Sequence, residues 1–270
     1  MEADSIIRFR ELTFGYGDRT IINNLSFNIP KGRVVAIMGG SGVGKTTLLK
    51  IITGLMTPNP EQVFVFGKDF GLLEQREINN LRKKIGLLFQ FGALFTDLSC
   101  FENVAFPLRE HTNLSATLLE TTVMLKLESV GLRGAAHLMP SEISGGMARR
   151  VALARAIALG PELILYDEPF SGLDPISLGV TARLIRKLND ALGSSSVIVT
   201  HDVLETFEIA DFVYLLGPSE NGAVLIASGT PKEISENNDP FVQQFINGKQ
   251  LGPVKFHYPC ESRKKFFLNR

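Results

Sequence analysis

The sequence predicts an α/β fold built on a largely parallel sheet, with an antiparallel β section at its start and an inserted helical segment. Three observations support this prediction. Short apolar runs typical of buried strands alternate with helical patterns along most of the chain. The opening runs IIRFRELTFGYG and NNLSFNIPKG have the pattern of antiparallel strands next to a Gly-rich turn. Between residues 92 and 160 the strand-like runs stop and helical periodicity takes over.

The elements of the core follow from local signals in chain order. RVVAIMG is a continuous apolar run and is expected to be a buried strand. TTLLKIITGL is expected to be a helix that ends at Gly54, because Pro58 and Pro60 follow it. KIGLLFQ is the next expected strand. The strand pattern then returns in three later runs, ELILYDEP, SSVIVTHD and FVYLLG.

Residues 92–160 contain one well-marked helix. Ser115 is a suitable N-cap for it, and Gly131 is a suitable end. Between these two residues, apolar side chains recur every three to four positions, at Leu119, Val123, Leu127 and Val130. The segment is therefore predicted to be a helical subdomain inserted into the α/β core.

The chain divides into four predicted parts. The first part of the core covers residues 1–91, the helical subdomain 92–160 and the second part of the core 161–239. After Pro240 the regular pattern breaks down, so residues 240–270 are predicted to be a polar C-terminal extension with scattered aromatic side chains.

Composition and charge exclude several classes of protein. The 28 basic and 28 acidic residues cancel, so no overall field favours nucleic acid or an anionic membrane surface. Hydrophobic residues make up 44% of the chain, which reflects either a large core or surface for partners. Cys100 and Cys260 lack metal or disulfide spacing, as expected in a reducing compartment. No leader pattern or membrane-spanning run is expected, so any membrane would be reached through another polypeptide.

A phosphate-binding loop lies between the first buried strand and the first helix. Residues 39–47, GGSGVGKTT, match the pattern GxxxxGK[ST]. Its glycines let backbone N–H groups point at phosphate oxygens. Lys45 is expected to bring positive charge to the β- and γ-phosphates of ATP, and the Thr46 hydroxyl to bind Mg²⁺. The predicted nucleotide-binding residues of this loop are Gly39, Gly40, Ser41, Gly42, Val43, Gly44, Lys45, Thr46 and Thr47.

Two carboxylates and a histidine follow later strands. Asp167 and Glu168 end the LILYDEP strand. Asp167 is expected to hold Mg²⁺ through water, and Glu168 to be the general base that orients the attacking water. His201 follows SSVIVT and is expected to hydrogen-bond the γ-phosphate. The predicted catalytic residues are therefore Lys45, Glu168 and His201.

Two further residues complete the predicted nucleotide site. Gln90 closes KIGLLFQ, and its amide is expected to reach Mg²⁺ or the attacking water. The predicted magnesium ligands are thus Thr46, Gln90 and Asp167. Tyr16 is expected to stack on the adenine, with a simple strand turn at FGYG as the alternative.

The order of these motifs resembles that of the ATP-binding cassette (ABC) ATPases. An aromatic residue, GGSGVGKTT, a glutamine, ISGGM, LILYDEP, SGLDP and a histidine match in order over about residues 6–235. The resemblance implies a P-loop NTPase fold of the ABC nucleotide-binding type, with ATP and Mg²⁺ as cofactors. It also implies a homodimer in which two cassettes pair head to tail.

The resemblance implies that the ISGGM loop closes over the ATP held by the partner copy. A second helix N-terminus is useful only on the opposite side of the γ-phosphate, which agrees with that arrangement. Met147 stands where the family usually has glutamine, so a side-chain hydrogen bond to the ribose is not expected there. This signature loop consists of Ser144, Gly145, Gly146 and Met147. The loop expected at the dimer seam, where Asp174 would link the two sites, consists of Ser171, Gly172, Leu173 and Asp174.

Three segments outside the ATP motifs narrow the resemblance: FGALFTDLSCFENVAFPLREHT, VMLKLESVGLRGAAHLMPSEISGGMARR and GPVKFHYP. They are similar to the ATPase subunits of the Mla phospholipid transport systems of Gram-negative bacteria. This implies a peripheral protein at the cytoplasmic face of the inner membrane that drives phospholipid transport between the inner and outer membranes. The implied partners are membrane permease subunits, a small cytoplasmic STAS-domain protein and a periplasmic MCE lipid-binding protein.

Two other functions compete with this interpretation. A soluble cassette ATPase acting on DNA or ribosomes would need a coiled-coil insertion or a second cassette, and the neutral charge argues against nucleic acid. A small-molecule kinase could share the phosphate-binding loop, but ISGGM, LILYDEP and the late histidine argue against it.

Aromatic residues in two regions leave alternatives open. Phe91, Phe95, Phe101 and Phe106 either anchor a permease helix or fill the core of the helical subdomain. The tail at residues 248–270 contains several aromatic side chains and is expected to dock across a second copy of the chain. A frayed terminus is the alternative.

Overall fold

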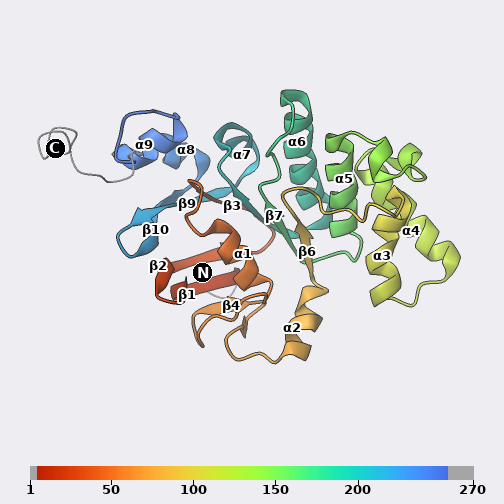
Figure 1. The fold of residues 1–270 in the computed structure, drawn as a ribbon, viewed down its shortest axis with the longest axis horizontal. Helices are drawn as coiled ribbons and strands as arrows, with labels where there is room; N and C mark the ends of the chain where they lie inside the picture. Colours follow the sequence, from red (N-terminus) through yellow and green to blue (C-terminus); the bar gives the residue numbers. More distant parts are fainter. Residues whose placement is uncertain (1–4, 255–270) are drawn as a thin grey trace, which may run out of the picture.

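The computed structural model describes residues 5–254 of the 270-residue chain (Figure 1). Its strands are β1 (Ser5–Tyr16), β2 (Arg19–Pro30), β3 (Val34–Gly39), β4 (Val63–Val65), β5 (Lys68–Asp69), β6 (Ile85–Leu88), β7 (Leu163–Asp167), β8 (Ser195–Thr200), β9 (Phe212–Ser219) and β10 (Gly222–Gly229). Its α-helices are α1 (Lys45–Ile52), α2 (Gln75–Arg82), α3 (Cys100–His111), α4 (Ala116–Ser129), α5 (Gly145–Ala156), α6 (Pro175–Leu192), α7 (Val203–Ile209), α8 (Pro231–Ser235) and α9 (Pro240–Ile246). Short 3₁₀ helices lie at Arg133–Ala135 and Pro140–Glu142. None of the helices in the described part combines the length and apolar character of a membrane span.

A single mixed sheet of 10 strands runs through the described structure, in the order β5-β4-β1-β2-β10-β9-β3-β8-β7-β6. Strands β9, β3, β8, β7 and β6 pair in parallel. All residues of β3 and β8 are buried, as expected for central parallel strands that are covered on both faces. The predicted α/β fold with a largely parallel sheet is therefore confirmed.

The antiparallel section is the other half of the same sheet. β1 pairs with β2 and with β4, and β4 pairs with β5, all antiparallel. β10 joins the two halves, because it pairs antiparallel with β9 and, at Ala223, parallel with β2. The ring of Tyr214 stacks on Phe27 with 4.2 Å between centroids, and its hydroxyl donates to the carbonyl of Asn28 at 2.6 Å. These contacts hold the β1–β2 hairpin beside the parallel strands.

Helices α3, α4 and α5 lie together at one end of the molecule, between β6 and β7 in the sequence (Figure 1). The helix predicted after Ser115 is confirmed as α4, whose N-cap serine accepts the N–H of Leu118 at 3.4 Å. Val123 and Leu127 of α4 are fully buried against α3 and α5, in a cluster that also contains Tyr166 of β7. This shared cluster fixes the helices against the parallel part of the sheet.

Regular structure continues past Pro240, the residue after which the sequence pattern breaks down. Pro240 begins α9, whose N-cap Asp239 accepts the N–H groups of Phe241 and Val242. The helix has only seven residues, too few for a helical period to appear in the sequence. The Gln244 side chain of α9 also exchanges hydrogen bonds with both backbone groups of Val254. The rest of the predicted docking tail, residues 255–270, lies outside the described residues.

A buried asparagine shapes the start of the helical segment. Asn103 of α3 is fully buried. Its carbonyl oxygen accepts the N–H of Phe95 at 2.9 Å, and its amide donates to the carbonyls of Phe95, Leu98 and Ser99, each at 3.0 Å. One side chain therefore satisfies the backbone of the whole turn that precedes α3.

We expect Asn103→Ala to lower the free energy of unfolding by about 1–3 kcal/mol, because it removes the hydrogen-bond partner of part-buried backbone groups of Phe95 and Leu98. Denaturant unfolding followed by circular dichroism measures the change. Asn80→Ala, at an exposed position of α2, is the matched control and should change stability by less than about 0.5 kcal/mol. Equal effects of the two substitutions would contradict the role of Asn103.

Candidate functional site

The predicted phosphate loop, residues 39–47, connects β3 to α1. Gly44 has a φ of 85°, and a Cβ atom there would lie 3.0 Å from the Ile21 side chain of β2, so the loop requires glycine at this point. Lys45 is only 7% exposed, and its Nζ donates to two carbonyls of its own loop at 2.9 and 3.1 Å. Its ammonium therefore lies inside the loop, where a phosphate would be held.

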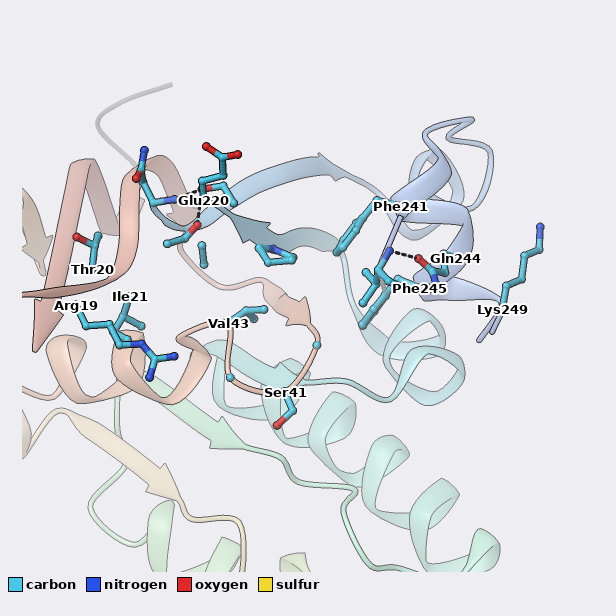
Figure 2. Close-up of a pocket in the computed structure, with 18 of the residues that line it drawn as sticks. Arg19, Thr20, Ile21, Ser41, Val43, Glu220, Phe241, Gln244, Phe245 and Lys249 are labelled. Atoms are coloured by element: carbon cyan, nitrogen blue, oxygen red, sulfur yellow. Dashed lines mark hydrogen bonds between the residues drawn. The ribbon is translucent and has the colours of Figure 1, made fainter. Parts of the chain in front are cut away.

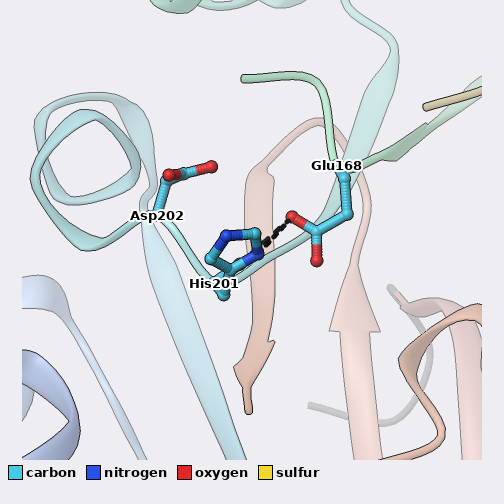
Figure 3. Close-up of side chains that lie close together, drawn as sticks. All are labelled: Glu168, His201 and Asp202. Atoms are coloured by element: carbon cyan, nitrogen blue, oxygen red, sulfur yellow. Dashed lines mark hydrogen bonds and ion pairs between the residues drawn. The ribbon is translucent and has the colours of Figure 1, made fainter. Parts of the chain in front are cut away.

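Glu168 is the central residue of the site (Figure 3). It follows β7 with a φ of 47°, and its N–H donates to the carbonyl of Val199 in β8 at 2.8 Å. One carboxylate oxygen lies 3.4 Å from Nζ of Lys45, and the other lies 2.9 Å from Nδ1 of His201. The side chains of Glu168 and Lys45 are both buried, so their attraction is little weakened by water. The three residues predicted to be catalytic are thus direct neighbours.

Asp167 lies beside this group at the end of β7. The Thr46 hydroxyl donates to its Oδ1 at 3.4 Å. Burial, and then the negative charge of Glu168, raise the pKa of Asp167 above its usual value. A cation close to these two carboxylates would relieve their repulsion, and the hydroxyl and carboxylate oxygens are ligands that Mg²⁺ prefers.

Gln90 follows the neighbouring strand β6. Leu88, the last residue of β6, pairs in parallel with Tyr166 of β7, so Gln90 lies just beyond the same end of the sheet as Glu168. The backbone carbonyl of Gln90 accepts a hydrogen bond from Arg149 of α5 at 2.5 Å. The structure therefore places the predicted glutamine at the same edge of the sheet as the two carboxylates.

Tyr16 lies at the end of β1 and is 47% exposed. Its hydroxyl donates to Sδ of Met56 at 3.2 Å. A cavity of about 870 Å³ lies between the β1–β2 turn, the phosphate loop, the β9–β10 turn and α9 (Figure 2). Arg19, Ile21 and Val43 line this cavity, and Tyr16 does not. The predicted adenine-stacking residue thus lies at the turn that borders the cavity, outside it.

The signature loop, residues 144–147, begins α5. Ser144 caps the helix, and its hydroxyl accepts the N–H of Met147 at 3.2 Å. A Cβ atom on Gly146 would lie 3.1 Å from Oγ of Ser177, so the loop packs against the start of α6. The Met147 side chain packs against the helical core, which gives it a structural role. Among the recorded hydrogen bonds and ion pairs of residues 5–254, none joins this loop to the phosphate loop of the same chain.

The loop expected at the dimer seam follows Glu168 and ends at α6. Asp174 caps α6, and its Oδ1 accepts the N–H groups of Ile176 and Ser177, both at 3.0 Å. Hydrogen bonds from Ser177 hold the pKa of Asp174 below its usual value. The N–H of Ser171 donates to the Glu168 carbonyl at 3.3 Å, so the loop is tied directly to the central residue of the site.

Two residues next to the site were not predicted. Asp202 lies beside His201, and ligand atoms of Glu168, His201 and Asp202 fall within 4.8 Å of one another (Figure 3). The sequence signal for Asp202 was its position directly after His201, which itself follows a strand. Arg149 is buried and donates to the carbonyls of Gln90 and Pro169. Only its position in the arginine pair that follows the signature loop marks it in the sequence.

Comparison with known proteins identifies the family. The model of the ABC transporter family matches residues 22–171. The chain is 52% identical over 261 residues to the intermembrane phospholipid transport system ATP-binding protein MlaF of Haemophilus influenzae, covering 97% of each chain. It is 50% identical to the protein of the same name from Escherichia coli K12, over 95% of this chain and 94% of the relative. A dimeric structure of the ATP-binding cassette MJ0796, bound to ADP and Pi, has a TM-score of 0.72 and 31% identity, and covers 83% of this chain and 98% of that chain. The chain therefore belongs to the ATPases of the ABC transporter family.

Proposed function

We propose that the chain is the ATP-hydrolysing subunit of an inner-membrane ABC transporter that moves phospholipid between the inner and outer membranes. Such transport maintains the lipid asymmetry of the outer membrane. One observation carries the phospholipid part: the 52% identity to a protein named for that transport, over 97% of both chains. This similarity extends well beyond residues 22–171, the part that the family model matches.

Glu168 is proposed to be the general base of ATP hydrolysis. Its carboxylate would accept a proton from the water that attacks the γ-phosphate. His201, whose Nδ1 lies 2.9 Å from one carboxylate oxygen of Glu168, would hydrogen-bond the γ-phosphate. Lys45 lies 3.4 Å from the other oxygen, and its ammonium would bring positive charge to the β- and γ-phosphates of ATP. The burial of both charges supports these roles, because a buried charge needs an opposite charge close by.

Mg²⁺ is proposed as the cofactor, with Thr46, Gln90 and Asp167 as its protein-side contacts, Asp167 through water. The contact between the Thr46 hydroxyl and Oδ1 of Asp167 at 3.4 Å supports this proposal, because it brings together two oxygens of the kind that Mg²⁺ prefers. When bound, the ion would neutralise charge on the phosphate oxygens. These residues would hold and orient the ion at the edge where α1 begins and where β6 and β7 end.

A second copy of the chain is proposed to complete each ATP site. Ser144 and the N-terminus of α5 would face the γ-phosphate held by Lys45 of the other copy, and Asp174 would lie at the seam. Two features support this. The signature loop packs on α6 and, within residues 5–254, has no hydrogen bond to its own phosphate loop, and the related cassette MJ0796 is dimeric with ADP and Pi.

A groove of about 580 Å³ between α2, β6 and α3 is proposed to receive the permease. Phe89, Phe95 and Phe106 line it and are 44%, 40% and 42% exposed. Exposed rings gathered in a groove are typical of a surface that binds an apolar helix face. Phe101, in contrast, packs against the core of the helical segment, and Phe91 lies outside the groove. The alternative that all four predicted phenylalanines fill the core is therefore disfavoured.

The proposed function also assigns a role to each part of the chain and a location to the protein. Residues 1–91 and 161–239 would form the ATP-binding core and 92–160 the helical subdomain. The protein would be peripheral at the cytoplasmic face of the inner membrane, with a STAS-domain protein and, through the complex, a periplasmic MCE protein as further partners. Residues 240–270 would link the two copies, although only residues up to 254 are described.

We expect Glu168→Gln to lower the rate of ATP hydrolysis at least about 100-fold, because the amide cannot accept the proton. Nucleotide binding should persist, since Lys45 and the phosphate loop are unchanged. Phosphate release and fluorescent-nucleotide binding measure the two properties. Glu162→Gln is the control, because Glu162 is an exposed residue just before β7. Its rate of ATP hydrolysis should stay within about twofold of the wild-type rate. Near wild-type hydrolysis by the Glu168 variant would show that the base is misassigned.

Mixing Lys45→Ala and Ser144→Arg proteins, each inactive alone, should restore ATP hydrolysis to about a quarter of the wild-type rate. Half of the mixed population would be heterodimers with one intact site of two. Lys45→Ala mixed with Glu168→Gln is the control. Lys45 and Glu168 act on the ATP bound by their own chain, so each chain of a heterodimer would disable its own site and no intact site would form. Absence of activity in the first mixture would contradict shared sites.

We expect Phe106→Asp to reduce recovery of the permease about tenfold when the protein is affinity-purified from detergent-solubilised membranes, because the charge cannot be buried against an apolar helix. The wild-type preparation should contain a permease and bound phospholipid. ATP binding by the variant should remain within about twofold. Leu72→Asp, at a position 67% exposed and outside the groove, is the control. Unchanged permease recovery with the Phe106 variant would disprove docking in this groove.

A further inference from the structure

Two arginines of α5 hold the loop that follows β6. Arg155 donates to the carbonyl of Gly92 at 2.7 Å and to that of Ala93 at 2.9 Å. Arg149 donates to the carbonyl of Gln90 at 2.5 Å. The loop also lies directly on the helix, since a Cβ atom on Gly92 would be 3.3 Å from Cβ of Ala152. Charge-assisted bonds and close packing therefore make the loop and α5 one unit.

Arg149 differs from Arg155 because it also reaches the catalytic strand. Its second guanidinium nitrogen donates to the carbonyl of Pro169 at 2.6 Å, directly after Glu168 in the chain. One planar group thus joins three segments: the helix that begins with the signature loop, the Gln90 turn and the turn after Glu168. The rigid fork of a guanidinium fixes the spacing of the two carbonyls that it binds.

The surroundings of Arg149 argue against a role in stability alone. The residue is 7% exposed, and burial lowers its pKa. Among the described residues, no carboxylate forms an ion pair with it. A buried charge with only neutral partners is less stabilising than a well-packed apolar side chain of similar volume. The effect of Arg149 is therefore to fix the relative positions of the Gln90 and Pro169 carbonyls more than to increase the free energy of unfolding.

We propose that Arg149 is a positioning residue for ATP hydrolysis, which sets the spacing between the Gln90 turn and Glu168. This inference rests on the proposed function, because Gln90 and Glu168 take their roles from it. The Gln90 amide and the Glu168 carboxylate then keep a fixed separation at the nucleotide. Both would move together with the N-terminal part of α5, because Arg149 binds the two turns. Arg155 holds the same loop but does not reach the catalytic strand, so it provides a matched comparison.

The test uses the full-length purified protein with Arg149→Met, Arg149→Lys and Arg155→Met. Each variant is measured for kcat, for KM of ATP, for the Mg²⁺ concentration giving half-maximal rate, and for melting temperature. Arg149→Met should lower kcat at least about tenfold and raise the Mg²⁺ requirement about threefold, with KM of ATP within about twofold. Arg149→Lys should recover part of kcat, because an ammonium can still donate to the carbonyls. Arg155→Met should keep kcat and the Mg²⁺ requirement within about twofold at a comparable melting temperature.

Two results would overturn the proposal. One is a kcat of Arg149→Met within twofold of the wild type, and the other is equal losses for Arg149→Met and Arg155→Met that follow their melting temperatures. If Arg149→Met does not fold, Arg149→Lys decides: a raised Mg²⁺ requirement supports positioning, and wild-type values overturn it. A wild-type protein without ATP hydrolysis would overturn the proposed function instead, so the two failures are distinguishable.

Discussion

The buried carboxylate of Glu168 is the feature on which the rest of the site depends. It lies between the ammonium of Lys45, which begins α1 after β3, and the imidazole of His201, which follows β8. A buried charge persists only with partners at close range, so β3, β7 and β8 must meet in one register. The φ of 47° at Glu168 is a sparsely populated backbone state for a side chain of this kind, and the bond from its N–H to β8 holds it there.

The helical segment gives this site a second connection, to the surface. The loop after β6 carries Gln90 at one end and lies next to the phenylalanine-lined groove at the other. It is held at three carbonyls by α5, the helix whose first residue follows Ser144. A partner in the proposed docking groove and a phosphate at the proposed ATP site would therefore act on the same rigid unit, and we propose that this unit couples the two sites.

Features with local causes could be predicted from the sequence. The phosphate loop depends on glycines, a lysine and a threonine at fixed spacing, and the strands β3, β7 and β8 are continuous apolar runs. Because carboxyl ends of parallel strands share one edge, the gathering of Asp167, Glu168 and His201 also followed. Side chains that bind distant backbone had no such signal. No sequence pattern predicts the hydrogen bonds from Asn103 to the turn before α3 or those from Arg149 to two distant carbonyls. The seven residues of α9 are too few to show a helical period. The roles of the individual phenylalanines depended on packing that only the fold decides.

We propose that each chain contributes its phosphate loop to one ATP site and its signature loop to the other. A structure of the Glu168→Gln protein with ATP and Mg²⁺ tests it most directly. We expect two copies in contact, with Lys45 of one copy and Ser144 of the other within hydrogen-bond distance of the same γ-phosphate. A γ-phosphate enclosed by Lys45 and Ser144 of a single chain, or one bound without any second copy beside it, would contradict the account.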